Sequence, residues 1–403
     1  MKTKAIITLY LLISMSCFAG LSPEEKLKTK AEKIHRSVFT VDSHTDTPMR
    51  LMGGDFDVNI KHETGSSKVD FPRMKEGGLD GIFFAVFVSQ GKRDPQSNTK
   101  VKNEAFEILD TIDAVLKRNQ ASAGIALKPE DAYGLKKEGK IAVFIGMENG
   151  YPLGNDLTLV ERFFNRGVRY ITLCHTRNND ICDSSTDTLG FGGLSRFGRE
   201  VVQEMNRLGM MIDVSHISDK SFYEVLHLTK TPVIASHSCS RALCDNPRNL
   251  SDEMLKALSA NGGVVQMCIL SAYVKADPNP ARDSAQAALR KKYHNFENLS
   301  KDEKTAVRKE WNDLEEKFPP HLATVSDVVD HIDHMVKVAG IDHVGIGTDF
   351  DGGGGVKGCN NVSEMGNITL ELVKRGYSKS RIKKIWGGNL MRVMKQNLDH
   401  AGK

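Results

Sequence analysis

The sequence predicts an α/β fold in which eight parallel strands close into a TIM-like (β/α)8 barrel. Eight short apolar runs have the length and β-branched content of fully buried strands, and segments with helical spacing separate them. Six of these runs stop at a residue that can bind a metal ion or transfer a proton. Because the C-terminal ends of parallel barrel strands emerge on one face, these residues are expected to meet in one pocket. The runs are 38–44, 79–89, 141–148, 169–175, 210–216, 232–237, 263–270 and 343–349.

Length and composition favour one large domain. Residues 21–403 of the 403-residue chain are predicted to form a single domain, since barrels with insertions commonly reach this size. The 55 basic and 51 acidic side chains nearly balance at a net charge of +4, and no basic run is interleaved with aromatic residues. A nucleic-acid-binding protein is therefore not expected. The mean hydropathy of -0.34 argues against a polytopic membrane protein.

Residues 1–20 have the pattern of an export signal peptide. Lys2 and Lys4 precede an apolar stretch, 5–18, that is too short for a membrane span, and small residues follow it. Cleavage after Ala19 would leave an exported protein, periplasmic or associated with the cell envelope. Lipidation of Cys17 is the alternative, and it would anchor the protein to a membrane as a lipoprotein. The other six cysteines form no CxxC pair and are expected to be buried thiols, although export permits disulfides.

Helical periodicity fills most of the gaps between the strands. Apolar residues recur at helical spacing in segments that should cover the outside of the barrel. These segments are 23–37, 103–118, 157–167, 197–209, 218–229 and 325–340. After the seventh strand comes a charged segment, 275–322, which we interpret as a helical insertion that caps or borders the barrel mouth. The glycine run at 352–355 lacks the lysine of a P-loop, and it predicts a flexible turn that other groups approach closely.

Five of the strand-end residues are typical metal ligands. His44 and Asp46 are two residues apart, so they are expected on the same side of an extended strand. Glu148 ends a strand with no other charge, and its burial calls for an arginine, a helix N-terminus or a bridging position between two cations. His216 and His237 end consecutive strands and would offer a second cation two neutral imidazoles, although either alone would suit a core histidine. Imidazole and carboxylate together suit zinc or a similar divalent ion.

His175 and Asp349 also end strands, and they suit roles in substrate binding or proton transfer. A histidine facing the reacting carbonyl can stabilise an oxyanion, and a carboxyl group beside metals can carry a proton to a leaving group. For Asp349 the alternative is direct metal binding, and Asp351, already in the turn, is a poorer substitute. The remaining histidines are not expected in the pocket. They are His35, His62, His227, His294, His321, His331, His334, His343 and His400.

Taken in order, these motifs resemble the renal, or membrane, dipeptidase family of zinc peptidases. The resemblance runs from about Val41 to Asn389. It rests on VDSHTDTP, GMENG and LCHTRNN, followed in the same order by FGREVVQEMNRLGMMIDVSH, ASHS and VGIGTDFDGG. An ordered set of this extent is highly specific, whereas an HxD triplet alone is common by chance.

The resemblance implies a barrel of the metal-dependent hydrolase type with two Zn2+ ions per subunit, acting as a homodimer on free dipeptides. Dipeptides with a D-residue in the second position (L-Xaa-D-Xaa) are included. By motif, His44 and Asp46 would bind one zinc ion, His216 and His237 the other, and Glu148 would bridge them. A hydroxide bridging the metals would attack the peptide carbonyl.

The resemblance also implies how the substrate is held. His175 would contact the scissile carbonyl or the oxyanion, and Asp349 would be the proton shuttle. Arg248, which its sequence context alone would place at the surface, would pair with the C-terminal carboxylate through its two-pronged guanidinium. Longer peptides should fit poorly, because both ends of the dipeptide are fixed. The chain departs from the mammalian enzymes in the seventh strand, where residues 266–268 read QMC and those enzymes have a carboxylate-binding tyrosine.

Two other functions stay open at this point. A related amidohydrolase on the same barrel, such as an N-acyl-D-amino-acid deacylase, is disfavoured by HxD in place of HxH and by Glu148 as the bridging group. Fold analogy does not settle the substrate. A non-catalytic surface binding protein would keep the pocket without turnover, and the complete ligand set disfavours it.

Overall fold

The chain folds into the predicted α/β barrel in a computed structural model that describes residues 22–402 except 64, 66, 297–298 and 320. Eight parallel strands follow one another in the order β1-β2-β4-β5-β6-β7-β8-β9. A parallel bridge between Thr45 and Phe350 joins the two ends of this sheet. The strands are β1 (Val41–Thr45), β2 (Gly81–Phe87), β4 (Ile141–Glu148), β5 (Val168–Thr172), β6 (Met211–Asp213), β7 (Ile234–Ser238), β8 (Val264–Met267) and β9 (Val344–Ile346). The predicted signal peptide and Cys17 lie outside the described residues.

Two features of the sheet differ from the prediction. A short strand, β3 (Ala123–Ile125), pairs in parallel with the start of β4 outside the barrel order, and three residues are too few to show a strand period in the sequence. Several barrel strands also stop before the apolar run ends. Asp46, His175, His216 and Asp349 therefore lie in the turns that follow strands. Their positions are set by turn geometry as well as by the sheet.

Aromatic rings fill the inside of the barrel. Phe83 stacks on Phe144 with ring centroids 4.6 Å apart, and Tyr170 lies 5.4 Å from Phe83. The Tyr170 ring requires Gly146 on the neighbouring strand, because a Cβ atom there would lie 2.1 Å from the ring. The last helix, α17 (Asn389–His400), packs apolar side chains against the same cluster. The barrel is thus a packed core and not a channel.

The predicted outer helices are present with shifted ends. α2 (Pro23–Ser37) agrees with the prediction, and Ser22 and Glu25 form a capping box at its start. α5 (Pro95–Arg118) begins earlier than predicted, because Asp94 caps it and proline is tolerated in a first turn. The others are α7 (Thr158–Asn165), α8 (Arg196–Leu208), α9 (Asp219–Leu228) and α14 (Val325–Ala339). Helices beyond the prediction are α3 (Thr47–Leu51), α4 (Phe71–Gly77), α6 (Pro129–Lys137), α10 (Asp252–Ala260), α11 (Ser271–Val274), α15 (Gly366–Lys374), α16 (Lys379–Lys383) and the single turns η1 (Tyr151–Leu153), η3 (Ile341–His343), η4 (Val362–Glu364) and η5 (Lys384–Gly388).

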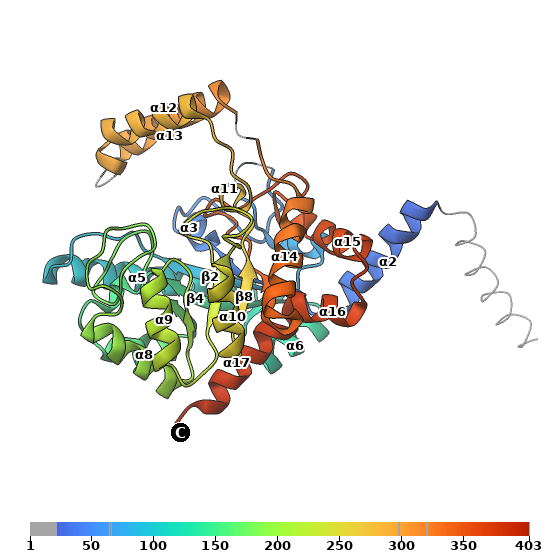
Figure 1. Ribbon diagram of the computed structural model, residues 1–403, viewed down its shortest axis with the longest axis horizontal. Coiled ribbons are helices and arrows are strands. Elements are labelled where there is room, and N and C mark those ends of the chain that lie inside the picture. The colour runs from blue at the N-terminus through green and yellow to red at the C-terminus, as the bar shows by residue number, and fades with distance from the viewer. Residues whose placement is uncertain (1–21, 64, 66, 297–298, 320, 403) are drawn as a thin grey trace, which may run out of the picture.

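The predicted insertion after the seventh barrel strand is a helical arm. It contains α12 (Pro280–Lys292), η2 (His294–Phe296) and α13 (Lys301–Lys317). α12 and α13 pack on each other and project away from the body of the barrel in Figure 1. Its root, α11, belongs to the rim of the pocket. Among the described residues, no helix has both the length and the apolar character that a membrane span requires.

Candidate metal centre

The first group of candidate ligands lies where β1 ends. His44 is within β1, and Asp46 is the residue before α3, with φ of -90° and ψ of 22°. The two therefore do not share one face of an extended strand, as the spacing predicted. The turn nevertheless brings His44 Nε2 to 3.6 Å from Asp46 Oδ2, and both side chains are buried.

Glu148, the last residue of β4, stands between two groups of ligands. Its Oε2 atom lies 3.4 Å from His44 Nε2. Its Oε1 atom lies 3.1 Å from His216 Nε2 and 3.4 Å from His237 Nε2. Ligand atoms of His44, Asp46 and Glu148 all lie within 4.8 Å of one another, and so do those of Glu148, His216 and His237. A carboxylate that turns a different oxygen to each group has the arrangement of a bridge between two cations.

The second group consists of two imidazoles. His237 is within β7, and His216 follows β6 in the left-handed conformation, with φ of 71°. Their Nε2 atoms lie 2.8 Å apart. Burial lowers the pKa of both His216 and His237 well below the usual value. The neutral form, which binds metal, is therefore favoured at both positions.

Two buried polar atoms of the first group have no hydrogen-bond partner among the described residues. They are His44 Nε2 and Asp46 Oδ1. Buried polar atoms are normally bonded, and leaving one unpaired costs about 1–3 kcal/mol. A cation between them would satisfy both atoms. The residues present therefore fit divalent ions with nitrogen and oxygen ligands.

Tyr170 orients His44 from inside the barrel. His44 Nδ1 lies 2.8 Å from Tyr170 Oη, which lies 3.1 Å from the carbonyl oxygen of Ser43. A carbonyl only accepts, so Tyr170 donates to Ser43 and accepts from His44 Nδ1–H, which leaves Nε2 as the ligand atom. The sequence does not single out Tyr170, because a tyrosine in an apolar strand suits a core position. The available signal is Gly146 opposite its ring, and recognising it requires the strand register.

His175 and Asp349 lie at the edge of this cluster. His175 Nε2 is 3.8 Å from Glu148 Oε1, and its side chain is 24% exposed. Burial lowers the pKa of His175, so its imidazole is neutral and can donate a hydrogen bond. Burial, reinforced by Cys268 and Asp46, raises the pKa of Asp349 well above the usual range. A ligand atom of Asp349 also lies within 4.8 Å of those of His44 and His237, so the geometry permits metal binding as well.

Arg248 is buried, contrary to the surface position that its sequence context suggests. It is 3% exposed and donates to Ser238 Oγ at 2.8 Å and to the carbonyl oxygen of His237 at 2.7 Å. Its Nε atom has no hydrogen-bond partner, and no carboxylate pairs with the guanidinium, among the described residues. A buried cation without a counter-charge is costly, so this position favours an anionic ligand.

Tyr273 in α11 lies beside Arg248. Its ring centroid is 5.7 Å from the Arg248 guanidinium carbon. Burial raises the pKa of Tyr273 to about 12, so its hydroxyl is a neutral donor. Gln266, in the strand where the mammalian enzymes have their tyrosine, is 1% exposed. A tyrosine is thus placed next to the arginine from the rim after β8, a position that the sequence does not single out.

Several turns at the pocket have a strained backbone. Asn149, His216, Asp349 and Asp351 have φ of 73°, 71°, 61° and 66°. A non-glycine residue in this region costs on the order of 1 kcal/mol and persists where the surroundings hold it. Three of these positions carry or adjoin candidate ligands. Strain is therefore concentrated where the chain leaves the strands.

Gly352 confirms the close approach predicted for the glycine run. A Cβ atom at Gly352 would lie 2.1 Å from Asp46 Oδ2 and 2.4 Å from Asp349 Oδ1. Only a residue without a side chain leaves room for both carboxylates. Asp351 points elsewhere and accepts hydrogen bonds from Thr47 Oγ1 at 3.0 Å and from the Lys68 backbone at 2.7 Å. Asp351 therefore joins the start of α3 to the loop that contains Lys68.

Three of the histidines that were not expected in the pocket have structural partners elsewhere. His331 accepts from the Ser240 backbone N–H at 3.1 Å and lies 2.8 Å from the Val274 carbonyl oxygen. His334 lies 2.7 Å from Asp252 Oδ1, and His343 lies 2.7 Å from the Gly263 carbonyl oxygen. The six cysteines among the described residues are buried and free.

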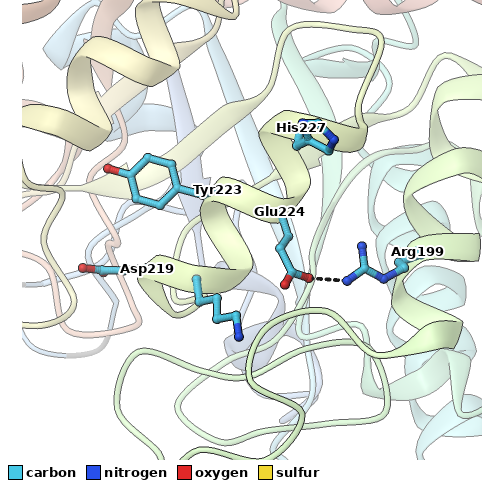
Figure 2. Close-up of a pocket in the computed structure, with 6 residues that line it drawn as sticks. Arg199, Asp219, Tyr223, Glu224 and His227 are labelled. Atoms are coloured by element: carbon cyan, nitrogen blue, oxygen red, sulfur yellow. Dashed lines mark hydrogen bonds and ion pairs between the residues drawn. The ribbon is translucent and has the colours of Figure 1, made fainter.

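A hollow on the outer surface shares no lining residue with the metal centre. Figure 2 shows its lining residues, which are Arg199, Asp219, Lys220, Tyr223, Glu224 and His227. Glu224 pairs with Arg199 at 2.7 Å, and Asp219 pairs with Arg241 at 2.7 Å. Because both carboxylates are already neutralised, we assign this hollow no ligand.

Comparison with known proteins identifies the family. The model of the membrane dipeptidase family (peptidase family M19) matches residues 28–402. The chain belongs to the membrane dipeptidase family. It is 32% identical to dipeptidase 3 of Macaca fascicularis over 94% of this chain and 69% of that protein. It is 31% identical to dipeptidase verJ of Clonostachys rogersoniana over 91% of this chain and 86% of that protein.

Two solved structures have the same fold. The probable dipeptidase PvdM from Pseudomonas aeruginosa superposes with a TM-score of 0.83 at 32% identity, covering 94% of this chain and 100% of that one. A metallopeptidase from Rhodobacter sphaeroides, solved with a phosphinate mimic of the dipeptide L-Ala-D-Ala, superposes with a TM-score of 0.72 at 21% identity, covering 89% and 99%. The protein is a metallo-dipeptidase on a (β/α)8 barrel, as the ordered motifs predicted.

Proposed function

We propose that this metallo-dipeptidase is a binuclear zinc enzyme. His44 and Asp46 bind one ion, His216 and His237 bind the other, and Glu148 bridges them. The observation that carries the proposal is the division of the Glu148 oxygens, with Oε2 toward His44 and Oε1 toward His216 and His237. When bound, two such ions activate water near neutral pH and polarise the scissile carbonyl. Cobalt and manganese suit the same ligand set, and metal analysis distinguishes them.

Arg248 holds the C-terminal carboxylate of the substrate. Its burial, its unpartnered Nε–H and the lack of a neighbouring carboxylate among the described residues support this role. A guanidinium recognises a carboxylate with two parallel hydrogen bonds, a geometry that lysine cannot supply. With the carboxylate fixed at Arg248 and the free amine near the metal ligands, the pocket would measure the length of a dipeptide.

His175 and Asp349 act on the reacting groups. The neutral imidazole of His175 donates to the carbonyl oxygen as it becomes an oxyanion, because it lies beside Glu148 and is partly exposed to the pocket. Asp349 takes a proton from the attacking water and delivers it to the leaving amine, and its raised pKa suits that exchange. Dipeptides with a D-residue in second position are included among the substrates. The phosphinate mimic of L-Ala-D-Ala held by the Rhodobacter sphaeroides metallopeptidase supports this extension.

The setting of the enzyme is also part of the proposal. Residues 1–20 would be removed as a signal peptide, leaving an exported enzyme of the periplasm or cell envelope that assembles as a homodimer. Lipidation at Cys17 is the alternative route and would hold it at the membrane. Mass spectrometry of the mature N-terminus separates the two routes, and gel filtration with light scattering tests the dimer.

The first test is hydrolysis of matched substrates by the purified mature enzyme. Free dipeptides, their C-terminal amides, L-Xaa-D-Xaa members, tripeptides and N-acetylated amino acids are compared with and without added zinc. We expect zinc-dependent cleavage of free dipeptides. Arg248→Lys should erase the preference for a free carboxylate over an amide, at a loss of roughly 10- to 100-fold in kcat/KM. The matched control is Arg166→Lys, because Arg166 lies on the outer surface, where it pairs with Asp110 and Asp113.

Other outcomes would favour the remaining functions. Cleavage confined to N-acyl substrates would make the protein an N-acyl-D-amino-acid deacylase. A metal-filled protein that cleaves no member of the panel would be a non-catalytic binding protein. Loss of dipeptide cleavage in Asp349→Asn, with metal content unchanged, would support proton transfer by Asp349 over metal binding by it.

A further inference from the structure

A buried carboxylate, Asp213, lies behind His237 and has no part in the reaction described above. It ends β6 and is fully buried. Its Oδ1 atom accepts from the backbone N–H groups of Ser215 at 3.0 Å and Ser236 at 2.8 Å. Its Oδ2 atom accepts from the hydroxyls of Thr172 and Ser236, both at 2.5 Å. All four partners are donors, so Asp213 is an acceptor on every side, as an ionised carboxylate is.

The single hydroxyl hydrogen of Ser236 fixes the tautomer of His237. Ser236 Oγ lies 2.5 Å from Asp213 Oδ2 and 2.8 Å from His237 Nδ1. Because Asp213 offers only lone pairs, the hydroxyl donates to it, and Ser236 Oγ must then accept from His237 Nδ1–H. His237 Nε2 keeps its lone pair, and it faces Glu148 Oε1 at 3.4 Å. A hydrogen bond to one imidazole nitrogen commonly sets which nitrogen binds a metal.

The negative charge of Asp213 would also stabilise a cation bound by His216 and His237. The ligands that belong to this half alone, His216 and His237, are neutral, and Glu148 is shared with the other half. A fully buried anion without a basic partner among the described residues is costly unless a cation lies nearby. The chain Asp213, Ser236, His237 leads directly to the place where the proposed second ion would bind.

We propose that Asp213, acting through Ser236, is the positioning residue of the second metal position. It holds His237 as an Nε2 ligand and supplies the negative charge that the two imidazoles lack. The inference rests on the proposed binuclear centre and assigns a role to residues that do not themselves touch metal or substrate. Thr172 offers a control for this role, because its hydroxyl donates to the same Asp213 oxygen but is not connected to His237.

The test is a metal titration of the mature protein after its metal has been removed by chelation. Zn2+ is titrated first, and Co2+ is titrated separately and followed by visible absorption. Wild type should bind two equivalents. Ser236→Ala and Asp213→Asn should keep the first equivalent and bind the second roughly 10- to 100-fold more weakly, the usual effect of losing an outer partner of a metal-binding histidine. Thr172→Val, which deletes the other hydroxyl on Asp213 Oδ2, should bind both equivalents as wild type does. Nitrogen-15 NMR of labelled histidine would show the Nδ1–H tautomer of His237 in wild type and its loss in Ser236→Ala.

The outcomes separate this inference from the proposed function. Equal weakening of both equivalents, an unchanged second equivalent, or a Thr172→Val variant as weak as Ser236→Ala would each overturn the role of Asp213. A wild-type protein that binds a single equivalent would instead contradict the binuclear centre itself. Should Asp213→Asn fail to fold, as judged by circular dichroism, Ser236→Ala decides the question alone.

Discussion

The two halves of the proposed binuclear centre, His44 with Asp46 and His216 with His237, place their negative charge differently. In the first half, Asp46 is itself a candidate ligand. The hydrogen bonds of the His44 imidazole run through Tyr170 to the neutral carbonyl of Ser43, and a buried carboxylate, Asp42, contacts His44 only at its backbone N–H. In the second half, both dedicated ligands are imidazoles, and a carboxylate stands one hydroxyl behind His237. A carboxylate can therefore serve a cation site either as a ligand or one residue behind a ligand. We expect the second half to depend more strongly on the residues that hydrogen-bond to its ligands.

Glu148→Gln should have the largest effect, because Glu148 belongs to both halves. The substitution keeps the shape and removes the shared charge, so both metal equivalents should be lost. Dipeptide hydrolysis should fall by more than the roughly 10²–10³-fold that removal of one oxyanion donor costs. Metal analysis and kcat/KM measure the two losses, with Glu224→Gln on the outer surface as the control. Loss of a single equivalent would assign Glu148 to one half only and contradict its role as the bridge.

Gly352→Ala should damage the first half alone. Its Cβ atom would collide with the Asp46 and Asp349 carboxylates, whereas the imidazoles of the second half lie outside the contacts of this position. We expect the first equivalent to weaken and kcat/KM to fall by about 10- to 100-fold, the scale of a misplaced ligand. Gly366→Ala, where an added Cβ atom meets nothing within 4 Å, is the matched control. Weakening confined to the second equivalent would contradict the assignment of Asp46.

Tyr170→Phe should have a smaller effect on the first half than Ser236→Ala has on the second. The ring still fits over Gly146. The change removes two buried hydrogen bonds, and the one that acts on the candidate ligand, from His44 Nδ1–H, joins neutral groups and is worth about 1 kcal/mol. The first equivalent should therefore weaken by roughly five- to ten-fold. Tyr377→Phe, which removes a hydroxyl bonded to the remote Asp333, controls for the loss of a buried hydroxyl. A larger loss than in Ser236→Ala would reverse the ranking of the two supports.

The smallest expected effect is a pH dependence of the folding stability, which arises from His331 beside the end of β7. Burial lowers the pKa of His331, whose Nδ1 accepts from Ser240 just after β7. The unfolded chain then binds the proton more readily, so the contribution of His331 to stability is present above its unfolded pKa of about 6.5 and is lost as the pH falls below it. The melting temperature should drop by a few degrees at most. His331→Gln should melt lower at neutral pH and lose this part of the pH slope, and an unchanged slope would exclude His331 as its source.

The sequence predicted the barrel and brought the candidate ligands together because both depend on local patterns. Apolar runs define the strands, and a polar residue at the end of a run marks the open face of a parallel barrel. The residues that hold the candidate ligands in place could not be predicted, because the contacts of Tyr170, Asp213 and Ser236 depend on strand register and side-chain direction. Asp46 reached the pocket through a turn and not through strand alternation. Burial of Arg248 likewise depends on how its loop folds back on β7.

The strained turns set a limit on how this enzyme can be made more heat-resistant. At Asn149, His216 and Asp349, glycine would relieve the left-handed backbone, so a design that scores conformation alone would select it there. His216 and Asp349 have proposed roles in metal binding and proton transfer, which glycine could not fill. The Asn149 side chain donates to Val88 and Gln90 and accepts from Tyr151 and Asn179. The stability lost in these turns cannot be recovered in place. Substitutions that raise the stability of engineered variants should therefore be sought in the outer helices, where a relaxed backbone conformation does not conflict with function.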